Sequence, residues 1–101
     1  MNGQVHVVPA ALEAFGSTSA ALGAATAGAA AGDVAQAAAM TAAFGLIGQD
    51  FLAAYAVAEA NHLRAVGQVA AVHSATAAAA AAGLAAFTET DVACGVGLGP
   101  R

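Results

Sequence analysis

The sequence predicts an all-α protein: an elongated antiparallel hairpin of two long helices. Of its 101 residues, 35 are Ala and 12 are Gly, and Ala has the highest helix propensity of all residues. Apolar residues recur at alternating spacings of three and four along two long stretches, a pattern typical of helices with one buried face. One short break separates the two stretches, and a short connection makes successive helices antiparallel neighbours.

The first helix is expected over residues 9–43. Pro9 fits the first helical position, where its missing N–H costs nothing. The apolar stripe of this helix consists of Val8, Leu12, Phe15, Ser19, Leu22, Thr26 and Ala29. Gly32 and Asp33 mark an interruption, because Asp33 and Gln36 have the spacing of a capping box. The pattern leaves open whether a helix restarts there or one helix continues with a kink.

The break between the helices, residues 44–49, is expected to be a tight turn. Gly45 and Gly48 flank two large apolar residues in a chain otherwise rich in Ala, and Gly has the backbone freedom that a chain reversal needs. We expect the large apolar side chains of this turn to fold inward between the helix ends: Phe44, Leu46 and Ile47.

The second helix is expected over residues 50–91, capped by Asp50 and roughly 60 Å long at 1.5 Å per residue. Its stripe consists of Leu63, Val66, Ala70, His73, Ala77, Ala80, Leu84, Phe87 and Asp91. Residues 1–93 are therefore expected to form one helical hairpin domain. Residues 94–101, in which Gly alternates with other residues, are expected to be a flexible tail.

Composition and charge exclude several classes of function. The chain has six acidic and two basic residues, no Lys, and a net charge of -4. A nucleic-acid-binding protein needs a basic surface to neutralise phosphate, and the same charge count excludes attraction to an anionic membrane. The uncharged stretch 70–87 has one Leu, whereas spanning helices depend on Leu, Ile, Phe and Val. We therefore expect no membrane contact.

The sequence offers no constellation for chemistry, and we expect no catalytic residue, cofactor or metal. His62 and His73 lie about 16 Å apart along one helix, too far to share a metal ion. Glu59 and His62 form an i, i+3 pair that we expect to be a solvated contact. Cys94 is the single cysteine and is expected to be a structural or incidental thiol, with an intermolecular disulfide as the alternative. The N-terminus lacks the basic and strongly apolar regions of a secretory signal peptide.

The end of the second helix carries an aromatic residue and an acid four positions apart, Phe87 and Asp91. This spacing places both side chains on one helix face. A carboxylate close to a helix C-terminus opposes the helix dipole. That position favours a role in recognition over a role in stability.

Together these features resemble the EspC-type family of type VII (ESX) secretion targets, which is related to the WXG-type helical hairpins of actinobacteria. The resemblance covers roughly residues 5–93 and includes the lead Val5-His6-Val7-Val8-Pro9, a first helix of small residues, Phe44-Gly45-x-x-Gly48-x-x-Phe51 at the turn, and Phe87-x-x-x-Asp91. The chain departs from the family pattern at two places. Phe44-Gly45 replaces a Trp-x-Gly turn, and Phe87 stands where the general secretion signal has Tyr.

The resemblance implies a small non-enzymatic substrate or accessory protein of an ESX secretion system. Such a protein is exported folded from the cytoplasm to the cell surface or beyond, together with a helical partner. It implies Phe87 and Asp91 as the secretion signal. The methyl-rich, weakly charged faces of the hairpin favour a four-helix arrangement, homomeric or heteromeric. Two alternatives stay open: an intracellular helical adaptor that is not exported, and a membrane-active Ala/Gly-rich helical protein.

Overall fold

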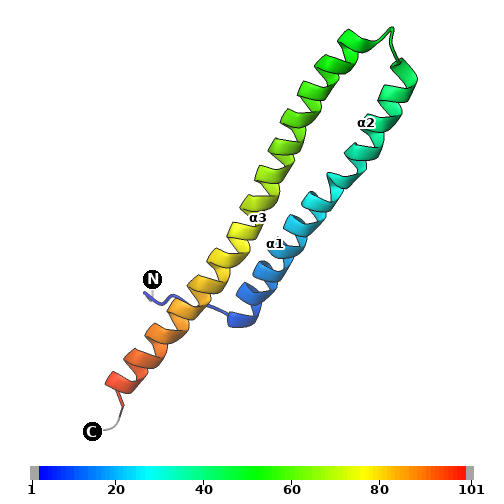
Figure 1. The fold of residues 1–101 in the computed structure, drawn as a ribbon. Helices are drawn as coiled ribbons and strands as arrows, with labels where there is room; N and C mark the ends of the chain where they lie inside the picture. The colour runs from blue at the N-terminus through cyan, green and yellow to red at the C-terminus, as the bar shows by residue number, and fades with distance from the viewer. Residues whose placement is uncertain (1–2, 100–101) are drawn as a thin grey trace.

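The computed structural model describes residues 3–99, apart from the side chains of Asp33 and Val34. It contains three helices: α1 (Pro9–Ala29), α2 (Ala31–Phe44) and α3 (Gln49–Gly97). No strand occurs between residues 3 and 99. α1 and α2 form one arm, and α3 returns antiparallel to it as the other arm (Figure 1). The molecule measures 85 × 23 × 19 Å, which confirms the predicted elongated all-α hairpin.

The helices begin close to the predicted positions. α1 begins at Pro9 after Val8, whose backbone is extended (φ -94°, ψ 107°). The N-cap of α3 is Gly48 and makes no side-chain capping bond, so Asp50 is not the cap that the sequence predicted. Asp50 instead lies in the first turn of α3, where a carboxylate interacts favourably with the helix dipole.

The first arm is interrupted at one residue, Ala30. The backbone N–H of Ala30 donates to the carbonyl oxygens of Ala27 and Gly28, and regular helix resumes at the next residue. The interruption therefore lies three residues before Asp33. The capping pair expected between Asp33 and Gln36 involves a side chain outside the described part of the structure.

α3 is longer than the sequence analysis predicted. It has 49 residues, about 74 Å at 1.5 Å per residue, and ends at Gly97 where an end at residue 91 was expected. The expected flexible tail, residues 94–101, is thus helical up to Gly97, and the Leu98 N–H donates to the Cys94 carbonyl at 3.0 Å. Each residue that extends an existing helix adds one backbone hydrogen bond. This gain opposes the lower helix propensity of Gly95 and Gly97, about 1 kcal/mol for each Gly relative to Ala.

The two arms meet through very small side chains. Ser19, Gly23 and Ala70 are the residues classed as buried among those described. A Cβ added at Gly23 would lie 3.0 Å from Ser74 Oγ and 3.2 Å from the Ala70 carbonyl oxygen. The backbones of α1 and α3 can therefore approach each other this closely because Gly23 has no side chain. We call this contact line the seam.

The predicted stripe of α3 is confirmed between Leu63 and Leu84, where its members are buried or half-buried. The stripe of the first arm was wrong in part. Phe15 and Leu22 remain 54% and 48% exposed. The α1 residues that face the seam are small or medium-sized: Leu12, Gly16, Ser19, Gly23 and Thr26. Two backbones this close leave no room for large side chains between them, so the large residues lie beside the seam.

Contact between the arms is unevenly distributed. α1 packs along α3, whereas α2 diverges from α3 and makes much less contact with it (Figure 1). The arms meet again at the turn, where the rings of Phe44 and Phe51 lie 4.7 Å apart between centroids, with 37° between their planes. The hairpin is therefore held together by the seam and by one aromatic contact at the turn.

The seam predicts opposite effects for two glycine substitutions in α1. Gly23→Leu should lower the free energy of unfolding by about 1–3 kcal/mol, because overpacking forces the backbones apart. Gly28→Ala should raise it by about 0.5–1 kcal/mol, because no heavy atom lies within 4 Å of the new Cβ and Ala is the better helix former. Urea unfolding followed by circular dichroism measures both. Equal stability of Gly23→Leu and the parent protein would contradict the seam.

Candidate functional site

The structure offers surfaces rather than a catalytic centre. Among residues 3–99, no group of three or more His, Cys, Asp or Glu side chains could hold a metal ion. His62 and His73 lie 11 residues apart on the continuous helix α3, about 16 Å at 1.5 Å per residue, so the structure does not bring the two histidines together. Cys94 is a free, exposed thiol.

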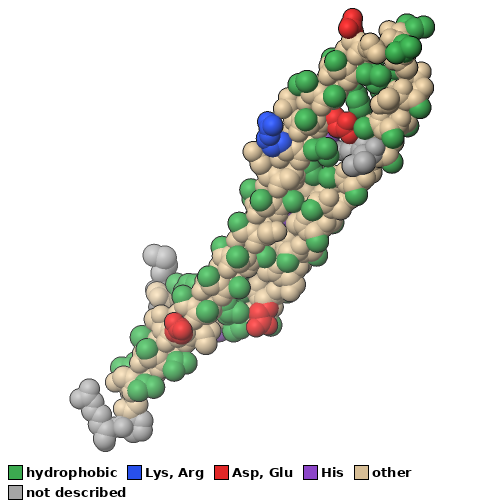
Figure 2. Space-filling model, viewed as in Figure 1, with side chains coloured by type: hydrophobic (Ala, Val, Ile, Leu, Met, Phe, Trp, Pro, Cys, Tyr) green, Lys and Arg blue, Asp and Glu red, His purple; other side chains and the backbone are tan. Residues whose placement is uncertain are grey.

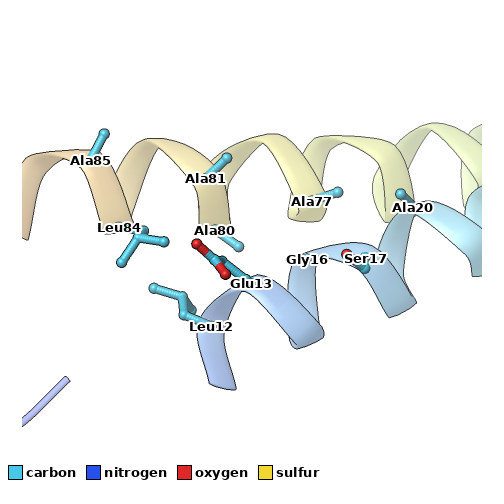
Figure 3. A pocket seen from close by; sticks show the side chains of 10 residues that line it. All are labelled: Leu12, Glu13, Gly16, Ser17, Ala20, Ala77, Ala80, Ala81, Leu84 and Ala85. Carbon is cyan, nitrogen blue, oxygen red and sulfur yellow. The ribbon is translucent and has the colours of Figure 1, made fainter. Parts of the chain in front are cut away.

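An open groove of about 670 Å³ lies between α1 and α3. Figure 3 shows its lining, mostly methyl groups together with Leu12 and Leu84. Glu13 is the one ionisable side chain among the lining residues. A lone carboxylate beside methyl groups has no second group with which to share proton transfer. We call this hollow the small-residue groove.

A smaller hollow of about 290 Å³ lies between α2 and α3, where the two helices diverge. Gln36 of α2 lines one side, and Tyr55, Glu59 and His62 of α3 line the other. The structure thus places Glu59 and His62, predicted to form a solvated pair, on the same hollow.

The seam separates two unlike flanks. On one side lies the small-residue groove, lined by Ser17 and Ala20 of α1 and by Ala81 and Ala85 of α3. Because each residue turns the helix by about 100°, the opposite side carries a different set of residues. We call it the large-residue flank, and its exposed members are Val8, Phe15, Leu22, Val69, Val72 and Phe87.

The predicted turn residues Phe44, Gly45, Gly48 and Phe51 lie together at the end of the hairpin. Gly45 has φ 52° and ψ -147°, a conformation that side-chain-bearing residues rarely adopt. The N–H of Gly48 donates to the Phe44 carbonyl at 3.1 Å, and a Cβ added at Gly48 would lie 2.7 Å from the Phe44 Cβ. Both glycines are therefore required by the geometry of the turn.

The expectation that the large turn residues fold inward was wrong for Leu46 and Ile47, whereas the Phe44 ring packs against Phe51 of the other arm. Leu46 and Ile47 are 84% and 102% exposed, and Phe44 is 43% exposed. With the Phe44 ring against Phe51, the two large residues between the glycines are left exposed. One feature of the sequence could have indicated this exposure. Turns lie at the surface and usually contain polar residues, whereas this turn has Leu46 and Ile47 in their place.

Phe87 and Asp91 belong to the last turns of α3, the helix whose C-terminal end extends past the start of α1 (Figure 1). Phe87 is 49% exposed and Asp91 is exposed. Because α3 continues to Gly97, Asp91 lies six residues before the helix end. The dipole effect falls off beyond the last turn, so the argument that Asp91 opposes the dipole was wrong. The four-residue spacing on one face remains.

α3 is also long and apolar enough to cross a membrane by length and composition. Its most apolar 18-residue window has a mean hydropathy of 1.5, and none of that window is buried within the hairpin. One such helix is weak evidence for a membrane span, because length and composition are the only criteria that it meets.

Comparison with known proteins matched the chain to a protein family. The family model described as "Excreted virulence factor EspC, type VII ESX diderm" matches residues 1–99 of the chain. No curated protein and no solved structure matches it. The family match covers the lead, both arms, the turn and the end of α3.

The turn predicts that Gly45→Ala lowers the free energy of unfolding by about 1–3 kcal/mol, because the backbone of Gly45 is strained for any residue with a Cβ. Gly67→Ala is the matched control. Gly67 lies within α3 with no heavy atom within 4 Å of the new Cβ, so its substitution should stabilise the protein slightly. Thermal unfolding measures both, and a Tm for Gly45→Ala at or above the parent value would contradict the turn geometry.

Proposed function

Because this chain belongs to the EspC family of excreted virulence factors of type VII ESX secretion, we propose that it is a small non-enzymatic substrate or accessory protein of an ESX secretion system. The family match over residues 1–99 carries this proposal. The protein is made in the cytoplasm and exported without a cleavable signal peptide to the cell surface or beyond. It acts there through contacts between helices rather than through chemistry.

Phe87 and Asp91 form the secretion signal. Their side chains are accessible and, being four residues apart, lie on one face of α3, towards the end of the helix that extends past the start of α1 (Figure 1). A receptor can bind the ring in an apolar pocket and the carboxylate with an Arg or Lys, which adds a charge-assisted hydrogen bond. The Thr88 hydroxyl donates to the Leu84 carbonyl at 2.9 Å, so it is engaged within the helix.

The hairpin acts with a helical partner, a second copy or another protein, in a four-helix arrangement. The large-residue flank supports this proposal, because it presents Phe15, Leu22 and Phe87 in a line beside the seam, each about half-exposed. The seam itself buries few large side chains, so a partner that covers this flank adds apolar burial that the single hairpin lacks.

Asp91→Ala should reduce export while leaving expression and thermal stability unchanged, because Asp91 is exposed and lies outside the seam. Glu89→Ala is the matched control, since Glu89 is an exposed acid two positions away on another side of α3. Phe87→Tyr should retain export, because it keeps the ring and adds the hydroxyl of the general signal. Immunoblots of cell and culture fractions from the producing host measure all three.

Normal export of Asp91→Ala would remove the signal assignment. Retention of the parent protein in the cytoplasm of a host with a working ESX system would favour the alternative function, an intracellular helical adaptor.

Replacing two residues of the large-residue flank, Phe15→Ser and Leu22→Ser, should raise the dissociation constant for the partner about 100-fold. Burial of each large side chain contributes about 1.5 kcal/mol or more, and 1.4 kcal/mol is a factor of ten. Sedimentation equilibrium measures self-association, and pull-down from the producing host measures capture of another partner. Ala20→Ser and Ala81→Ser on the small-residue groove form the control. A parent protein that stays monomeric and captures no helical partner would contradict this proposal.

A further inference from the structure

The end of the hairpin carries a cluster of large apolar side chains, two of which, Leu46 and Ile47, add no burial to the fold. Phe44 and Phe51 lie against each other below the turn, and Leu46 and Ile47 project from it, almost completely exposed. We call these four residues the hairpin tip. Figure 2 shows hydrophobic side chains gathered at that end of the molecule. An exposed apolar cluster of this kind marks an interaction site.

We propose that the hairpin tip inserts into the surface of a lipid bilayer, with Leu46 and Ile47 as the inserted side chains. Turns normally carry Gly, Pro, Asn, Asp or Ser, and the run from Phe44 to Gly48 contains no polar side chain. Neither Leu46 nor Ile47 contributes burial to the hairpin, so stability of the fold does not account for their presence.

The chemistry of the tip favours a bilayer over a pocket in another protein. Protein interfaces combine an apolar centre with hydrogen bonds at a polar rim, and the run from Phe44 to Gly48 has no side chain that could supply them. Two backbone N–H groups of this run are satisfied internally, since Gly45 donates to the Thr41 carbonyl and Gly48 to the Phe44 carbonyl, both at 3.1 Å. At the surface of a bilayer, headgroups and water can bind the remaining backbone groups and the polar residues Gln49 and Asp50, while the apolar side chains leave water.

The position of the tip also suits a membrane surface. The turn lies at one end of an 85 Å rod, so it can reach a surface ahead of both arms (Figure 1). This contact requires no spanning helix. The expectation of no membrane contact was based on the charge of the chain and on the weakness of a spanning segment, and it did not consider insertion by a turn.

Charge near the tip selects the lipid. Asp50 follows the tip in the first turn of α3, whereas Arg64 lies 14 residues farther along, about 21 Å at 1.5 Å per residue. Anionic lipids attract basic segments and offer nothing to an acidic tip. The tip therefore inserts into a zwitterionic bilayer, and anionic lipid weakens its binding.

Flotation with phosphatidylcholine vesicles tests the insertion. The parent protein should float with the vesicles, and Leu46→Ser with Ile47→Ser should lower its partition coefficient at least tenfold, since each buried side chain of this size contributes tenfold or more. Val96→Ser with Leu98→Ser is the matched control, because these two side chains are comparably exposed near the other end of α3. This control should bind like the parent, and vesicles containing phosphatidylglycerol should bind less protein.

A fluorescent reporter tests the same proposal independently. The chain has no Trp, so Ile47→Trp introduces a single one at the tip. Its emission should shift to shorter wavelength with phosphatidylcholine vesicles and be quenched by brominated lipid, whereas Val57→Trp, at an exposed position on α3, should show neither change.

Three results would overturn the proposal: no flotation of the parent protein, equal flotation of the tip variant and the parent, or an unchanged emission of the tip Trp. Loss of a protein partner by the tip variant without any vesicle binding would assign the tip to a protein pocket instead.

Discussion

The close approach of α1 and α3 at Gly23 is the constraint on which the rest of the hairpin depends. A Cβ at this position would meet Ser74 Oγ at 3.0 Å and the Ala70 carbonyl at 3.2 Å, so the two backbones pack as closely as they do only because Gly23 has no side chain. At the seam, close packing of Gly, Ser and Ala takes the place of interlocking large side chains. Dispersion attraction between the two helices would be lost quickly if a gap opened between them. Ser19 and Ala70 complete this narrow line of contact.

A seam made of small residues has a direct consequence for stability. An Ala or Gly contributes little apolar burial compared with a Leu or Phe, and the large residues Phe15 and Leu22 lie beside the seam, about half-exposed. The hairpin thus keeps most of its capacity for apolar burial on its outside. This distribution suits a chain that reaches full stability with a partner, as in the association that we propose for this member of the EspC family.

The rod shape distributes the exposed residues along its length. The turn end presents Leu46 and Ile47, the sides present the large-residue flank and the small-residue groove, and the end of α3 presents Phe87 and Asp91. α2, which diverges from α3, lies between the turn and the seam. A membrane contact at the turn is therefore separate from the other two contacts, whereas Phe87 belongs both to the flank that a helical partner covers and to the proposed export signal.

The sequence by itself determined the helical class, the antiparallel hairpin, the place of the turn and the family, because helix propensity, periodicity and glycine position act locally along the chain. The tertiary structure alone decided which residues of α1 meet α3. The heptad pattern placed Phe15 and Leu22 in one stripe with Ser19, but the close backbone approach at Gly23 leaves little room there, and these two large side chains lie beside the seam. The exposure of Leu46 and Ile47 was also decided by the tertiary structure, in which Phe44 packs against Phe51 of the other arm and the two residues between the glycines do not.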